Sequence, residues 1–122
     1  MKKNKNDFEL VFSERQSFLS ILNRLKEYLK NASLNHQAQV VQKVIDLLYL
    51  QNFDQFVKLI NSVDMWGGSG AVWEVYIENK EQTKSFEKDI INLIDLMEKT
   101  NILGNGIRRI RKIFKDNLKL KQ

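Results

Sequence analysis

The chain of 122 residues contains no cysteine, no proline and a single histidine. Without cysteine there is no disulfide, no thiolate metal ligand and no cysteine nucleophile. One histidine without cysteine does not assemble the usual zinc sites, and we expect neither a metal nor a cofactor. Because proline breaks helix interiors, its absence favours a helical fold with short connections.

Long apolar runs are also missing. No stretch approaches the roughly 20 residues that a membrane-spanning helix needs, and the basic start, residues 1–7, is not followed by the apolar segment of a signal peptide. We therefore expect a cytoplasmic protein. Its length leaves room for one helical domain over residues 1–122, with residues 1–6 as a frayed end. Lysine, asparagine and isoleucine are abundant, as in proteins of AT-rich bacterial genomes.

The few glycines divide the chain. All 5 lie in two clusters, Gly67-Gly68-Ser69-Gly70 and Gly104-Asn105-Gly106, and glycine is a strong local breaker of regular structure. Apolar residues at helical period predict three helices before the first break and two after it. The first helix follows a capping-box spacing at Ser13 and Gln16. The second is expected at about residues 35–50, the third to start near residue 52, the fourth at about residues 83–100, and the fifth to start near residue 105.

Two short stretches show strand period instead. In residues 71–78, Trp73, Val75 and Ile77 alternate with Glu74, Tyr76 and Glu78, which is typical of a strand. The only other candidate is residues 8–12, where aromatic and aliphatic side chains alternate similarly. The two stretches can pair as a hairpin, or be irregular or the start of a helix. The fold class predicted is thus mainly α: a compact bundle of about five helices, with one short strand or hairpin left open.

The first glycine cluster is the least ordinary segment of the chain. Trp66 and Trp73, the only tryptophans, flank Gly67, Gly68, Ser69 and Gly70. Successive amides in such a turn can form an anion-binding nest, and the indoles can form the walls of a partner or ligand site. The alternative is a tight reversal that the two tryptophans pin to the core. These six residues are our first candidate partner-binding set.

Known catalytic and nucleotide-binding motifs do not fit this segment. A phosphate-binding loop needs a lysine after its last glycine, and none follows. Trp73 stands where the dinucleotide fingerprint has its third glycine. Ala71 replaces the last glycine of a nucleophile elbow, which also needs a parallel sheet and a histidine base. We therefore expect no enzyme.

The positive charge is concentrated at the C-terminal end. Residues 108–122 carry a net charge of +6, whereas the preceding residues sum to −1. A basic sector beside an apolar stripe can dock on nucleic-acid phosphates, on anionic lipid or on an acidic protein surface; the alternative is a solvated face. Our second candidate partner-binding set is Arg108, Arg111, Lys112, Lys115 and Lys119.

A resemblance adds to these observations. The segment Trp66–Glu74, followed by the helix around Ile90–Met97, resembles small bacterial proteins with a Trp-Gly-Gly-x-Gly segment, which are similar to accessory and immunity-type proteins of toxin systems. The resemblance covers roughly residues 64–100 and implies protein–protein binding. Immunity proteins against nucleases tend to be acidic, and this chain is basic, so a nuclease is not the expected target.

From the sequence we therefore expect a non-enzymatic protein-interaction domain, an immunity-type or regulatory protein whose main partner is another protein. The alternative is a nucleic-acid-binding protein that uses its basic C-terminal helix. The sequence leaves the partner's identity and the oligomeric state open.

Overall fold

The computed structural model describes residues 5–120, and this part of the chain folds into helices joined by turns and bends, without a strand. The predicted mainly helical bundle is confirmed, with one additional helix at the start and one short helix before the first glycine cluster. The helices are α1 (Lys5–Ser13), α2 (Arg15–Asn31), α3 (Asn35–Tyr49), α4 (Phe53–Ile60), α5 (Val63–Trp66), α6 (Lys80–Lys99) and α7 (Arg108–Leu120).

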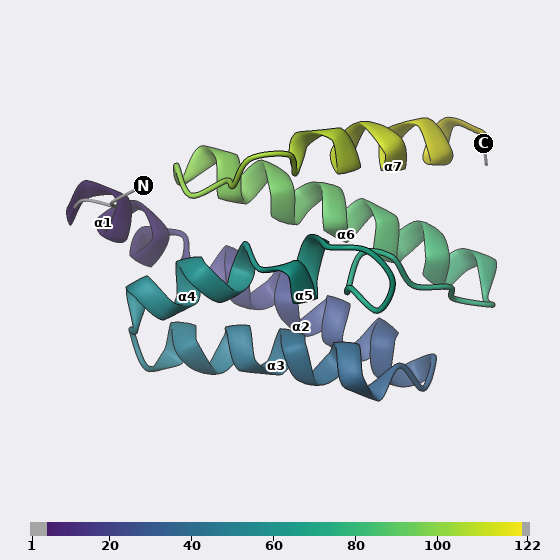
Figure 1. Ribbon diagram of the computed structural model, residues 1–122, viewed down its shortest axis with the longest axis horizontal. Coiled ribbons are helices and arrows are strands. Elements are labelled where there is room, and N and C mark those ends of the chain that lie inside the picture. Colours follow the sequence, from purple (N-terminus) through teal and green to yellow (C-terminus); the bar gives the residue numbers. More distant parts are fainter. Residues whose placement is uncertain (1–4, 121–122) are drawn as a thin grey trace.

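The long helices form a stack. In order, α3 packs on α2, α2 on α6, and α6 on α7, while α4 and α5 lie against α3 (Figure 1). The stripe predicted for the first helix does line the core, because Phe18, Leu22, Leu25 and Leu29 are fully buried. One cluster of buried apolar side chains extends from Val11 to Phe114 and joins these helices.

Helix α6 occupies an inner position in the stack. It has neighbours on two sides, α2 and α7, and its buried set is accordingly wider than the predicted arc. That set includes Asp89, whose carboxylate accepts two hydrogen bonds from the Arg24 guanidinium of α2 at 2.9 Å each. A bidentate bond to arginine compensates for the burial of the charge.

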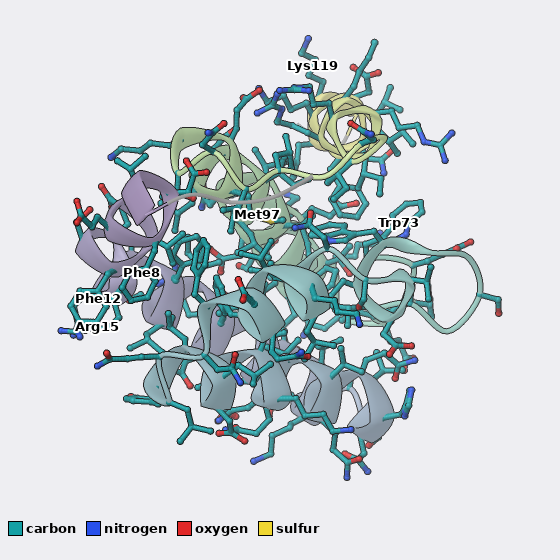
Figure 2. All side chains as sticks on the ribbon, turned by 60° about the vertical axis from the view of Figure 1, so that its left-hand side comes forward. Phe8, Phe12, Arg15, Trp73, Met97 and Lys119 are labelled. Atoms are coloured by element: carbon teal, nitrogen blue, oxygen red, sulfur yellow. The ribbon has the colours of Figure 1, made fainter. Side chains whose placement is uncertain are left out.

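Of the alternatives left open for residues 8–12, the start of a helix is confirmed and the strand is not, because these residues belong to α1. Phe8 and Phe12 are four residues apart and so lie on one helix face, with ring centroids 5.9 Å apart. Phe8 also meets Phe53 of α4 edge-on, and the Arg15 guanidinium lies 4.4 Å from the Phe12 ring centroid. Figure 2 shows Phe8, Phe12 and Arg15 close together at one side of the bundle. Of the expected frayed end, residues 1–4 lie outside the described part and residues 5 and 6 belong to α1.

Residues 71–78 do not form a strand either: of the open alternatives, irregular backbone is confirmed, with bends at residues 72–74 and 78. Its alternation nevertheless has a structural cause. Ile77 is buried and Val75 packs against the core, whereas Glu74, Tyr76 and Glu78 are exposed. The periodicity therefore reflects one buried side of this irregular segment, and residues 5–120 contain no strand.

Several helix ends depart from the sequence signals. The predicted capping box at Ser13 and Gln16 is absent, since Ser13 ends α1 and donates its hydroxyl to the Leu10 carbonyl. Helices α2, α3 and α6 each end in a Schellman motif, and in each the residue with positive φ is not glycine. These residues are Ser33, Gln51 and Asn101, with φ between 57° and 65°.

Candidate functional site

The glycine-tryptophan loop, residues 66–73, is anchored by its two indole groups. The Trp66 indole N–H donates to the Ile60 carbonyl at 2.6 Å, and the Trp73 indole N–H donates to the Gly67 carbonyl at 2.8 Å. Both rings are half-buried and pack against the core. Because both polar atoms of the indoles are bound within the chain, the tryptophans hold the reversal in place.

Backbone hydrogen bonds close the loop onto the start of α5. The Val72 N–H donates to the Asp64 carbonyl at 2.9 Å, and the Trp73 N–H donates to the Met65 carbonyl at 3.2 Å. Val72 is fully buried. Only the tip of the loop, residues 68–70, faces solvent, and there the Gln37 side chain of α3 donates to the Gly70 carbonyl.

Two cations of the basic helix are bound to α6. The Arg108 guanidinium donates to Glu98 at 2.8 Å, and Arg111 donates to Asp95 at 2.7 Å and to Glu98 at 2.9 Å. The Arg111 side chain is only 18% exposed. Hydrogen bonds from Arg111 and then Arg108 lower the pKa of Glu98, and the bonds to Glu98 and Asp95 raise the pKa of Arg111. These arginines fasten α7 to α6.

The remaining predicted cations face solvent. Lys112 is 3.2 Å from Asp116 on the same helix. Lys115 and Lys119 are exposed and form no ion pair with any residue of the described chain, 5–120. Figure 2 shows Lys119 on the outer side of α7, while Trp73 lies on the inner side. The predicted basic set therefore divides into two docking arginines and three solvent-facing lysines.

The start of the glycine-tryptophan loop and the first turn of α7 meet at a groove between α5 and α7. This α5–α7 groove has a volume of about 190 Å³. Its lining includes Ser62, Val63, Trp66 and Gly67 on one side and Arg109 and Ile110 on the other.

Nearby, the Trp73 and Phe114 rings lie 6.0 Å apart between centroids, which joins the glycine-tryptophan loop to α7. Of the predicted residues, Trp66 and Gly67 reach the α5–α7 groove. The five predicted cations do not contribute to its lining.

Arg109 is the functional candidate that the sequence analysis missed. It lies off the predicted basic sector, is exposed, and forms no ion pair within residues 5–120. Its position against Trp66 arises from the packing of α7, so its place in the sequence carried no signal. The sequence pattern groups the cations by helix face, whereas the lining of the groove also depends on the residues around α5 that lie beside α7.

The lining of the α5–α7 groove combines one cation with apolar surface. Val63 is 79% exposed, Trp66 is half-buried, and Arg109 is the one ionisable side chain among the lining residues. Ligand pockets usually measure about 300–1,000 Å³, so this groove suits a single side chain. The Ser62 hydroxyl oxygen is buried without a hydrogen-bond partner in the described chain. The exposed Arg109 guanidinium can donate to a carboxylate.

The fold and this groove define an all-helical protein with a small, cationic and partly apolar recess. No family model matches the chain, and neither the curated proteins nor the solved structures contain a significant match. Within residues 5–120, no acidic or histidine side chains gather in a group able to hold a metal ion. None of the described helices combines the length and apolar character that crossing a bilayer requires.

Proposed function

We propose that this protein is a non-enzymatic interaction domain that binds another protein at the α5–α7 groove. One observation carries the proposal: exposed Val63, half-buried Trp66 and unpaired Arg109 border one recess. Contact sites on proteins are enriched in tryptophan and arginine, which supply much of the binding energy. The complementary feature on the partner is a carboxylate beside an apolar side chain.

The resemblance described above supports a narrower form of the proposal, an immunity-type or regulatory protein of a bacterial cytoplasm. In that role the domain would occupy an acidic surface of its target. Binding through the α5–α7 groove requires no chemistry from the chain itself, which fits an inhibitor or regulator.

The test is selection of peptide ligands on the full-length protein. A displayed library of random dodecapeptides is expected to yield sequences in which aspartate or glutamate adjoins a large apolar residue. Arg109→Glu is expected to weaken their binding by at least about tenfold, equivalent to about 1.4 kcal/mol. Lys119→Glu is the matched control, because it makes the same charge change on α7 away from the groove. Equal losses in both variants would contradict the proposal.

A second experiment tests the nucleic-acid alternative. Fluorescence anisotropy with a labelled DNA duplex and a labelled RNA single strand is measured over a range of salt concentrations. If α7 bound phosphates, affinity would fall steeply with salt and Lys115→Ala together with Lys119→Ala would weaken it further. We expect no such binding, because Arg108 and Arg111 are already bound to carboxylates of α6.

A further inference from the structure

Residues 74–78 form a second unusual surface, separate from the α5–α7 groove. The side chains alternate: Glu74 and Glu78 are exposed, Val75 is half-buried, Tyr76 is 81% exposed and Ile77 is 6% exposed. One side of the segment is therefore buried and the other exposed, as in an edge strand, while its backbone bends at residues 74 and 78 and has no regular structure at residues 75–77. No residue of the described chain pairs with the segment, so its peptide groups form an open edge.

Most backbone N–H groups of this segment form no hydrogen bond within residues 5–120. None of the backbone N–H groups of residues 75–78 donates to another backbone group. The Ile77 carbonyl accepts from the Thr83 hydroxyl of α6 at 2.8 Å. Because successive residues of an extended chain direct their peptide groups to opposite edges, this bond places those of Tyr76 and Glu78 at the edge away from Thr83.

Two recesses flank the segment and leave this edge accessible. One, of about 700 Å³, lies between residues 76–79 and the turn after α2, residues 31–33. The other, of about 550 Å³, lies between residues 75–78 and the first turns of α6. Glu78 is the one formally charged side chain that lines the first recess, so its charge is negative. The second recess is lined by charges of both signs, Glu78 and Glu81 with Lys80 and Lys84.

We propose that residues 74–78 accept an extended basic segment of a partner protein as an added β-strand. Exposed strand edges recruit peptides through main-chain hydrogen bonds, and side chains provide the specificity. Glu74 and Glu78 flank the edge, and lysine or arginine placed opposite them forms favourable cross-strand pairs. The exposed Tyr76 ring between them offers a cation a favourable contact.

Charge also argues against a second copy of this chain as the occupant. An antiparallel pair centred on Tyr76 would place Glu74 opposite Glu78 of the other copy. A parallel pair in register would place each glutamate opposite itself. Like charges directly opposite each other destabilise strand pairing, so the edge favours a segment of the opposite sign.

The probe for this edge is a synthetic heptapeptide that alternates lysine or arginine with valine, titrated into the full-length protein and followed by amide NMR. We expect saturable shifts confined to residues 74–79 and slower hydrogen exchange at the Tyr76 and Glu78 amides. A peptide with glutamate in place of the cations, and one N-methylated at the pairing amides, are each expected to bind about tenfold more weakly. Equal binding of the N-methylated peptide would overturn the proposal, because the contact would then be electrostatic only.

Protein variants complete the experiment. Glu74→Lys together with Glu78→Lys is expected to abolish binding of the basic peptide, and both residues are exposed, so the fold should tolerate the change. Arg109→Glu is expected to leave this binding unchanged, which separates the edge from the α5–α7 groove. Absence of binding to the wild-type protein would overturn the proposal. So would concentration-dependent dimerisation that Tyr76→Pro removes.

Discussion

Gly67 lies at the end of α5, where the backbone folds back too closely for a side chain. A Cβ atom at this position would lie 2.6 Å from the Val63 carbonyl oxygen. Gly68, the next residue, has open space around the same position, with no atom within 4 Å. Of these two adjacent glycines, Gly67 lacks space for a side chain and Gly68 does not.

This difference predicts unequal effects of alanine at the two positions. Gly67→Ala forces the carbonyl of Val63 or the loop to move, and we expect it to lower the free energy of unfolding by about 1–3 kcal/mol. Gly68→Ala is the matched control, with an expected change within about 0.5 kcal/mol. Urea unfolding followed by tryptophan fluorescence measures both. A similar loss in the two variants would contradict the steric explanation for glycine at Gly67.

At the scale of elements, the ends of α2, α3 and α6 carry strain. Ser33, Gln51 and Asn101 occupy the left-handed position of their Schellman motifs, where a side chain costs roughly 1–2 kcal/mol relative to glycine. Asn101 alone has a compensating contact outside its own helix end, because its amide donates to Asp7 of α1 at 2.9 Å.

Glycine is therefore expected to stabilise the first of these positions. Ser33→Gly relieves the left-handed strain but increases the entropy of the unfolded chain by about 0.4–1 kcal/mol, which leaves a net gain of about 0.5–1 kcal/mol. Asn101→Gly gains the same relief but loses the bond to Asp7, and should be neutral or destabilising. Thermal unfolding of the two variants distinguishes these outcomes. A larger gain for Asn101→Gly than for Ser33→Gly would contradict this explanation.

The same helix ends show how far the sequence predicts the fold. Asn52 was expected to begin a helix, and its side chain does accept from the Gln55 amide at the start of α4. The boundaries of α3 were also close to those expected. The sequence left residues 8–12 open between a strand and the start of a helix, because Phe8 and Phe12 satisfy both the strand period of two and the helix spacing of four. The motifs that end α2, α3 and α6 contain no glycine and so gave no signal.

The candidate site was less predictable than the helices. The sequence identified Trp66 and Gly67, which line the α5–α7 groove, because glycine and tryptophan are conspicuous in this composition. It could not separate Arg111 from Lys115, which lie on one face of α7. That separation depends on Asp95 and Glu98 of α6, and their position opposite α7 follows from the turn at residues 100–107. Tertiary packing, absent from any local pattern, also placed Arg109.

At the scale of the whole molecule, α7 is attached to the stack by two kinds of contact. Ile107, just before the helix, and Ile110 and Phe114 on it are buried, and the ion pairs of Arg108 and Arg111 border that apolar contact. At the same end of α6, Lys99 lies 2.8 Å from Glu14, which connects the α1–α2 junction to the stack. Ion pairs that involve carboxylates thus attach both α7 and the α1–α2 junction to the C-terminal end of α6.

These contacts predict how stability depends on pH. Hydrogen bonds from Arg111 and Arg108 lower the pKa of Glu98, and the bond from Lys99 lowers that of Glu14. A carboxylate whose pKa is lower in the folded than in the unfolded chain, where glutamate titrates near 4.3, stabilises the fold above that value. The contribution disappears as the pH falls through the folded pKa. The stability of the whole molecule should therefore decline below about pH 5.

The test compares Glu98→Gln with the wild type from pH 7 to pH 3 by thermal unfolding. We expect the variant to be less stable at pH 7 and the two proteins to converge at low pH, because protonated Glu98 no longer pairs with the arginines. Glu27→Gln is the control, since Glu27 is exposed on α2 and forms no ion pair within residues 5–120; its difference from the wild type should stay small throughout. A Glu98→Gln difference that persists unchanged at pH 3 would place its cause in packing instead of charge. High salt at pH 7 should reduce that difference in the same way, because these ion pairs are exposed and are screened by ions.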